Sequence, residues 1–233
     1  MTRGMIAGAL LALMAAEAAA QSCTDDAVIV FDGSGSMAET GFNAIGAPRI
    51  TEARQAVHEV LPAVAPTRRL GLVLYGASGA QSCTDARLVL EPQPEAAGPI
   101  LAEIDALRPS GETALTEAVK LAAEVLRRGS GQGDVVLVTD GKETCGGTPC
   151  ALATTLMHDA PGITVHVIGF KVRGEHWDWS SPETEGVSVA RCLAEDTGGT
   201  YVNAETLEEL IGALRVTLGC NVFGALERRR LPG

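Results

Sequence analysis

Aromatic residues are scarce in this sequence. Of its 233 residues, 3% are Phe, Trp or Tyr and 46% are hydrophobic, so the core must be built from Val, Leu, Ile and Ala. That bias fits an α/β protein, and it does not point to a surface on which nucleotide bases stack. The length is enough for one domain with a substantial core, or for two small ones at most.

The N-terminal apolar stretch is too short for a transmembrane helix, which needs about 20 apolar residues. It runs over Met5–Met14, Glu17 interrupts it, and Ala18–Ala20 form a small-residue cleavage site. This pattern is typical of a secretory signal peptide. We therefore expect residues 1–20 to be a signal peptide and the mature chain to be periplasmic or secreted, without a transmembrane segment. The residues before Cys23 fit a lipidation box poorly, so a lipoprotein is not expected.

Positive charge is in the minority. Lys and Arg number 18 against 29 Asp and Glu, which gives a formal net charge of −11. An acidic exported domain repels nucleic acid and anionic lipid, so neither is an expected partner. We interpret the basic end, residues 221–233, as a solvated tail. No low-complexity linker interrupts the rest, so we expect one domain over residues 21–220.

Paired CxxC motifs are absent, and no His is placed to complete a zinc site. The six cysteines of an exported chain therefore predict disulfides. We rank the possible pairs by two features, the shortest loop between two cysteines and the cysteines near the two ends of the domain. Other connectivities stay open. The expected pairs are Cys145 with Cys150, Cys23 with Cys220, and Cys83 with Cys192.

Strand patterns alternate with helix patterns along the chain. The expected strands are Ala27–Phe31, Leu70–Tyr75, Arg87–Leu90, Val135–Thr139, Thr164–Phe170 and Thr200–Val202. The expected helices are Ile50–Val64, Ala96–Leu107, Ala114–Arg127, Ala151–His158, Val187–Asp196 and Leu207–Leu218. This alternation predicts an α/β fold, with a doubly wound, mostly parallel sheet and helices on both faces. The third strand follows the second with no room for a crossover helix, so we expect it to be an antiparallel edge strand.

The most informative motif follows the first expected strand. Asp32, Ser34 and Ser36 place one carboxylate and two hydroxyls two residues apart, separated by glycines that allow a tight turn. Convergent hard oxygens suit a cation such as Mg2+. Thr113 opens a later helix and Asp140 follows a later strand, so both are expected at the same rim of the sheet. Each residue alone is also an ordinary turn former, and Thr113 is a candidate N-cap.

Together these residues resemble the metal-ion-dependent adhesion site of von Willebrand factor type A (VWA) domains, written Asp-x-Ser-x-Ser, then Thr, then Asp. The resemblance covers roughly residues 25–218. It is strongest to bacterial exported members, which carry segments similar to Tyr75–Gly76, Thr139–Cys150 and Thr197–Tyr201.

The resemblance implies a Rossmann-like sheet with Mg2+, or alternatively Mn2+ or Ca2+, at its rim. Ser34, Ser36 and Thr113 would coordinate the ion through their hydroxyls, and Asp32 and Asp140 largely through water. It also implies a non-enzymatic module that binds a carboxylate of a partner protein at the open coordination position.

Two other functions stay open. One is a metal-dependent hydrolase of phosphate or ester substrates, although no candidate general base accompanies the metal ligands. The other is a structural scaffold with an unoccupied site. A dinucleotide fingerprint at Gly33–Ala38 is disfavoured, because Asp32 would face the pyrophosphate and no strand about 20 residues later ends in an acidic residue.

Both tryptophans, Trp177 and Trp179, lie in the loop after the fifth main strand. That loop is expected on the same rim as the metal ligands, and Trp is enriched at binding hot spots. We therefore expect it to frame the partner's docking surface. The alternative is that the two rings fold back as a hydrophobic lid.

Overall fold

The structure is a computed structural model, and it describes residues 25–77, 83–141, 143–172 and 185–219. Several predictions fall outside these ranges, and the structure does not test them. They are the signal peptide over residues 1–20, the tail over residues 221–233, the pairing of Cys23 with Cys220, and the placement of Trp177 and Trp179.

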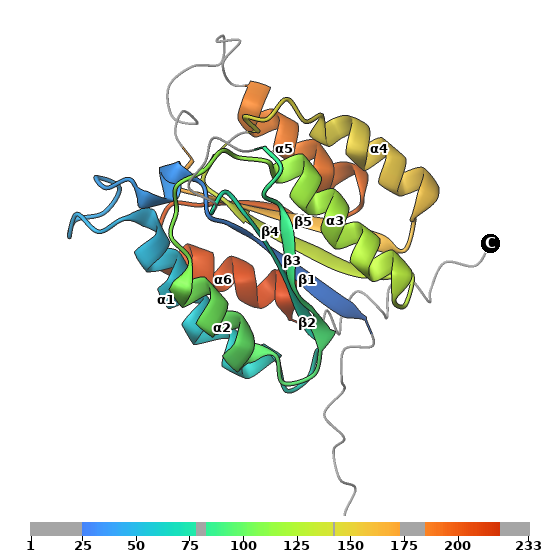
Figure 1. Cartoon of the computed structure of the whole chain (residues 1–233), viewed down its shortest axis with the longest axis horizontal. Helices are drawn as coiled ribbons and strands as arrows, with labels where there is room; N and C mark the ends of the chain where they lie inside the picture. The colour runs from blue at the N-terminus through green and yellow to red at the C-terminus, as the bar shows by residue number, and fades with distance from the viewer. Residues whose placement is uncertain (1–24, 78–82, 142, 173–184, 220–233) are drawn as a thin grey trace, which may run out of the picture.

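The described strands form one sheet in the order β3-β2-β1-β4-β5-β6 (Figure 1). Neighbouring strands are parallel, except that β3 runs antiparallel to β2 at the edge. The predicted fold class and the antiparallel edge strand are therefore confirmed. The strands are β1 (Asp26–Asp32), β2 (Leu70–Tyr75), β3 (Arg87–Gln93), β4 (Gly133–Thr139), β5 (Ile163–Phe170) and β6 (Tyr201–Ala204).

Helices cover both faces of the sheet, as Figure 1 shows: α1, α2 and α6 pack on one face, and α3, α4 and α5 on the other. They are α1 (Arg49–Val64), α2 (Ala97–Ala106), α3 (Leu115–Arg128), α4 (Pro149–Asp159), α5 (Glu185–Asp196) and α6 (Leu207–Leu218). A short 3-10 helix, η1 (Gly35–Ala38), follows β1 and was not expected from the sequence. None of the described helices is both long and apolar enough to cross a membrane.

β1 is buried on both faces, as a central parallel strand must be. Ile29 and Phe31 pack into the core under α1, α2 and α6, whereas Val28 and Val30 pack into the core under α3, α4 and α5. Each such side chain contributes about 1.5–3 kcal/mol through burial. The near-continuous apolar run before Asp32 is thus explained by its place in the middle of the sheet.

The order in which strands are added to the sheet reverses between β1 and β4. The chain leaves β1 through α1 toward β2 on one side, and it leaves β4 through α4 toward β5 on the other. In open α/β sheets, the crevice at the carboxyl ends of two such strands is where ligands bind. Asp32 ends β1 and Asp140 follows β4, so both lie at this crevice.

Candidate metal site

A buried carboxylate organises the turn after β1. Asp32 is fully buried, and its Oδ1 accepts a hydrogen bond from the backbone N–H of Ser34 at 2.7 Å. Its Oδ2 accepts one from the hydroxyl of Thr139, the last residue of β4, at 2.6 Å. An Asp side chain that bonds the backbone two residues on forms an Asx-turn. Asp32 therefore sets the direction in which the chain leaves the strand toward Ser36.

The glycines of this turn act differently from the expectation. Neither Gly33 nor Gly35 has a positive φ, so the turn does not depend on left-handed backbone. A Cβ on Gly33 would lie 2.8 Å from the carbonyl oxygen of Tyr75, which shows that Gly33 permits the close approach of two backbones. The turn itself is made by the Asp32 hydrogen bond and by η1.

A chain of hydrogen bonds joins the side chains of the turn to the end of β4. The hydroxyls of Ser34 and Ser36 lie 3.0 Å apart, and the Ser36 hydroxyl donates to Asp140 Oδ1 at 2.6 Å. Ser34 and Asp140 are 2% and 3% exposed. The structure thus brings four of the five predicted ligands, Asp32, Ser34, Ser36 and Asp140, into one small polar cluster.

The fifth residue, Thr113, lies at the same rim because the backbone just before it is bonded to the turn after β1. The N–H of Gly35 donates to the carbonyl of Gly111 at 2.9 Å, and Ser34 forms an isolated parallel bridge with Gly111. Thr113 is buried, and among the described residues its hydroxyl makes no hydrogen bond to the other four. The N-cap position of α3 belongs to Ala114, so the alternative interpretation of Thr113 as an N-cap is wrong.

A buried cation, not predicted from the sequence, contacts the cluster. Arg49 is the first residue of α1 and is 1% exposed. Its Nη1 donates to the carbonyl of Ser36 at 2.9 Å, to Asp140 Oδ2 at 3.0 Å and to Glu39 Oε2 at 3.2 Å. Its guanidinium also stacks 3.4 Å from the ring centroid of Phe42, a cation–π contact.

The surroundings of Asp140 raise its pKa to about 7. Burial contributes most, because it disfavours the charged form, and the negative charge of Asp32 acts in the same direction. The hydrogen bond from Ser36 and the charge of Arg49 partly oppose this rise. A further cation in this cluster would therefore stabilise the charged form of Asp140 beyond what Arg49 does.

Tyr75 and Thr139 form a second layer beneath Asp32 that sequence reasoning missed. The Tyr75 hydroxyl donates to Thr139 Oγ1 at 3.1 Å, and Thr139 in turn donates to Asp32. Burial and the charge of Asp32 raise the pKa of Tyr75 well above its usual value, so it stays a neutral donor. Both are the last residues of strands adjacent to β1. Their position at the ends of these strands could have predicted that they lie beside Asp32.

The donor set determines which metal the site could hold. Within the described ranges, no group of three or more His, Cys, Asp or Glu side chains is placed to hold a metal ion. The candidate site instead offers two carboxylates and hydroxyls, all hard oxygen donors. Such a set suits Mg2+, Mn2+ or Ca2+ and does not suit zinc or copper.

A family model for the von Willebrand factor type A domain matches residues 27–143, half of the chain. The chain belongs to the VWA domain family. It is similar to two uncharacterized Bacillus subtilis (strain 168) proteins along most of their lengths. It is 26% identical to YwmD over 82% of this chain and 84% of YwmD, and 28% identical to YwmC over 88% of this chain and 91% of YwmC.

Solved structures share the fold at low identity. A von Willebrand factor type A protein from Catenulispora acidiphila matches with a TM-score of 0.59 and 20% identity, over 83% of this chain and 42% of that one. The PilB minor pilin from Streptococcus sanguinis gives 0.61 and 17%, over 86% and 63%. The pilus adhesin SpaC from Lactobacillus rhamnosus GG gives 0.61 and 15%, over 83% and 30%. This VWA chain therefore spans about a third to two thirds of these structures.

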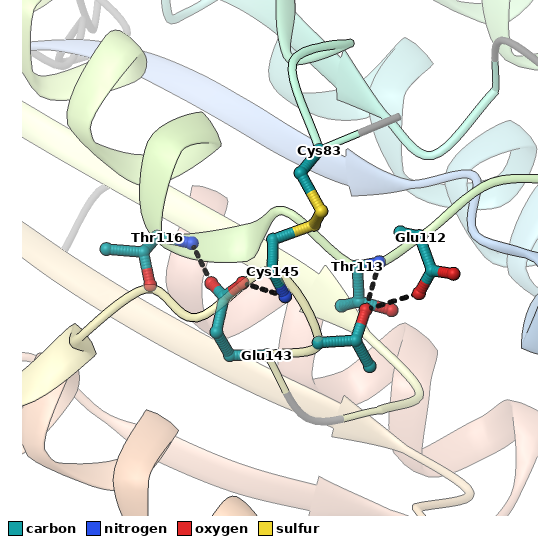
Figure 2. Close-up of a disulfide and its surroundings, with 7 residues drawn as sticks. Cys83, Glu112, Thr113, Thr116, Glu143 and Cys145 are labelled. Carbon is teal, nitrogen blue, oxygen red and sulfur yellow. Dashed lines mark hydrogen bonds between the residues drawn. A yellow bond between two sulfur atoms is a disulfide. The ribbon is translucent and has the colours of Figure 1, made fainter. Parts of the chain in front are cut away.

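The disulfides of the VWA domain differ from the predicted pairs. Cys83 bonds Cys145 (Figure 2), and Cys150 bonds Cys192. The predicted pairs of Cys145 with Cys150 and of Cys83 with Cys192 are therefore wrong. The physical reason is that α4 begins at Pro149, so Cys150 lies in a helix that packs against α5, while Cys145 stays in the preceding loop beside Cys83.

Replacing Gly76 with alanine is expected to lower the free energy of unfolding by about 3 kcal/mol. Gly76 follows β2 with φ of +73°, and a Cβ there would lie 2.5 Å from the backbone nitrogen of Ser34. The cost combines left-handed strain with an overlap between two backbones, and urea denaturation measures it. The matched control is Gly131→Ala, at φ +76° with nothing within 4 Å, expected to cost about 1 kcal/mol. Equal losses would contradict the overlap.

Proposed function

We propose that this VWA domain is a non-enzymatic protein-binding module of the periplasm or cell exterior that depends on a divalent metal. Ser34, Ser36 and Thr113 would hold Mg2+ through their hydroxyls, and Asp32 and Asp140 largely through water. The ion supplies a positive point to which a carboxylate of a partner protein binds.

The observation that carries this proposal is the chain of oxygens from Ser34 through Ser36 to Asp140, beside the buried Asp32. Burial raises the pKa of Asp140 most, and the negative charge of Asp32 raises it further. A divalent cation would oppose both effects, because it stabilises the charged form of Asp140. Neutral hydroxyls in the ligand set would leave the ion enough net charge to attract a further carboxylate.

Two findings support the proposed setting. Disulfides form and persist in oxidising compartments, and two of them hold this domain together. The same fold occurs in a minor pilin and in a pilus adhesin. That likeness is one of fold, so the partner of this domain has to be found by experiment.

Titration of the purified protein with Mg2+ by isothermal calorimetry tests the proposal. We expect saturable binding by the wild type and none by Asp32→Ala, which removes a buried carboxylate of the cluster. The control is Asp105→Ala, since Asp105 is a half-exposed carboxylate paired with His58, and it should bind as the wild type does. Unchanged binding by Asp32→Ala would contradict the metal site.

The partner can be sought by pull-down from the native cell envelope in parallel with and without EDTA. A partner that depends on the ion is expected on the wild-type protein with Mg2+, and it should be lost with EDTA and with Asp32→Ala. Mg2+-dependent turnover of phosphate or ester substrates, lost in Asp140→Ala, would instead indicate a hydrolase.

A further inference from the structure

The loop after β4 holds Thr113 by both of its backbone groups. The hydroxyl oxygen of Thr144 accepts a hydrogen bond from the N–H of Thr113 at 2.8 Å, and the N–H of Thr144 donates to the carbonyl of Thr113 at 3.1 Å. The Thr144 hydroxyl donates its own proton to Glu112 Oε2 at 2.8 Å (Figure 2). One residue therefore fixes Thr113, and it lies in the loop that begins at Asp140.

Glu143 attaches the same loop to the first turn of α3. Its Oε2 accepts from the N–H of Thr116 and its Oε1 from the N–H of Cys145, both at 2.8 Å (Figure 2). The first N–H groups of a helix have no partner within the helix, and Ala114 at the N-cap has no side chain that could accept from them. A carboxylate from a distant segment fills this role, at the end of the helix that favours negative charge.

Two disulfides among the described residues tie down the middle of this loop and the start of the helix that follows it. Cys145 is next to Thr144 and is bonded to Cys83, 62 residues earlier in the chain. Cys150, in the first turn of α4, is bonded to Cys192 in α5. Residues 143–148 have no regular secondary structure and are exposed or half-buried, so packing alone holds them weakly. A covalent tie at Cys145 restricts the open conformations that such a loop would otherwise populate.

We propose that Glu143 and Thr144 are positioning residues for the metal site, and that the Cys83–Cys145 disulfide keeps them in place. They form a clamp that holds Thr113 at a set position relative to Asp140. The inference rests on the proposed function, because it concerns the affinity of that same site for Mg2+. It adds that this affinity depends on the oxidation state of one disulfide.

The physical basis is that the ion's ligands come from separate segments. Asp140 follows β4, whereas Thr113 lies between α2 and α3, so a ligand set that includes both needs the two loops in register. Outer residues that orient metal ligands typically change metal affinity by about 10–100-fold when they are removed. The clamp is such a set, because it bonds the backbone of one ligand from the loop that carries another.

The decisive variants are Thr144→Val and Thr144→Ser. Valine keeps the shape of the side chain but removes the acceptor for the N–H of Thr113, so the dissociation constant for Mg2+ is expected to rise about tenfold. Serine keeps the hydroxyl, and its affinity should stay within about twofold of the wild type. Calorimetric titration with Mg2+ alone measures both. Equal affinity of Thr144→Val and the wild type would overturn the inference.

A matched control separates positioning from general stability. The hydroxyl of Thr197 likewise accepts a backbone N–H from another segment, that of Val165, at 2.9 Å, and Val165 lies near the start of β5, away from the carboxyl-end rim. Thr197→Val should lower the melting temperature yet leave the Mg2+ dissociation constant unchanged. A loss of affinity equal to that of Thr144→Val would overturn the positioning role.

The disulfides supply an independent pair of variants. Cys83→Ser with Cys145→Ser frees the clamp and should weaken Mg2+ binding about tenfold. Cys150→Ser with Cys192→Ser should not, because the buried side chains of Ala153 and Leu156 hold α4 in the core. Equal effects of the two double variants, or no effect of either, would overturn the role of the Cys83–Cys145 bond.

Hydrogen exchange tests the clamp without metal. The amide of Thr113 should exchange faster in Thr144→Val than in the wild type or in Thr144→Ser, because its acceptor has gone. Unchanged exchange would overturn the clamp even if Mg2+ binds. A wild-type protein that binds no Mg2+ contradicts the proposed function instead, and the exchange experiment then still tests whether Thr144 holds Thr113.

Discussion

Replacing Arg49 with methionine is expected to lower the free energy of unfolding by about 3–5 kcal/mol at pH 8 without metal. Arg49 and Asp140 form an ion pair whose side chains are 1% and 0% exposed, with Asp32 adding a second negative charge nearby. Removing the cation leaves buried acceptors without their donor, and at pH 8 it also makes Asp140 either stay charged without compensation or take up a proton, and each of these costs free energy. Denaturant unfolding of the metal-free protein measures the loss.

The loss should depend on pH, and this distinguishes electrostatics from packing. Arg49 lowers the pKa of Asp140, so without it Asp140 takes up a proton more readily. Near pH 5 that proton neutralises the carboxylate, and the cost of the substitution should fall by about 1–2 kcal/mol. A loss that is the same at both pH values would indicate that Arg49 acts only by packing.

The control is Arg215→Met. Arg215 pairs with Glu59 across the surface, with side chains 59% and 47% exposed. Exposed pairs of this kind contribute about 0–1 kcal/mol, because solvent screens them. A loss from Arg215→Met as large as that from Arg49→Met would contradict the importance of burial.

The fold was predictable because the hydrophobic residues of its strands and helices recur with a clear period. The errors in the bounds of elements occurred where the side chains show no such period. β2 and α6 have the expected bounds. β4 begins at Gly133, two residues before its apolar run, because pairing with β1 and β5 uses the backbone and needs no apolar side chain there. α4 begins at Pro149, a residue favoured in the first turn of a helix, ahead of the expected start. η1 is too short to leave a periodic signal.

Within the candidate site, the sequence predicted the oxygen-bearing residues but not the residues that hold them in place. Asp32 and Asp140 were predicted to meet because they follow parallel strands, and the structure places them in one cluster. Arg49 was missed because arginine is usually exposed. Its burial results from acceptors in two segments that are distant in sequence, Ser36 and Glu39 at η1 and Asp140 after β4. The disulfides were misassigned for a similar reason, since closeness in sequence does not measure closeness in space.

Mg2+ binding is expected to weaken about tenfold for each pH unit below about 7. The proposed site needs the charged form of Asp140, whose pKa is raised to about 7, first by burial and then by the charge of Asp32. Of the groups nearby, Arg49 opposes this rise, Glu39 adds to it, and Tyr75 stays neutral. Calorimetric titrations at about pH 8, pH 7 and pH 6 measure the dependence.

The raised pKa of Asp140 also determines whether the stability of the metal-free protein rises or falls with pH. Asp140 binds a proton more tightly in the folded protein than in the unfolded chain, where its pKa is about 4. Between about pH 4 and pH 7 the folded state therefore holds the extra proton, and its stability falls as the pH rises through that window. The proposed Mg2+ site requires the deprotonated folded form, so the stabilisation by Mg2+ should be small near pH 5 and full above about pH 8.

Asp140→Asn tests both halves of this account, because asparagine keeps the shape of the side chain and cannot titrate. In that variant the stability of the metal-free protein should fall much less between about pH 5 and pH 7 than it does in the wild type. Mg2+ binding should be lost at every pH. A wild-type Mg2+ affinity that stays flat across this range would contradict the linkage. So would a pH-dependent fall in metal-free stability that survives in Asp140→Asn, because another group would then be releasing the proton.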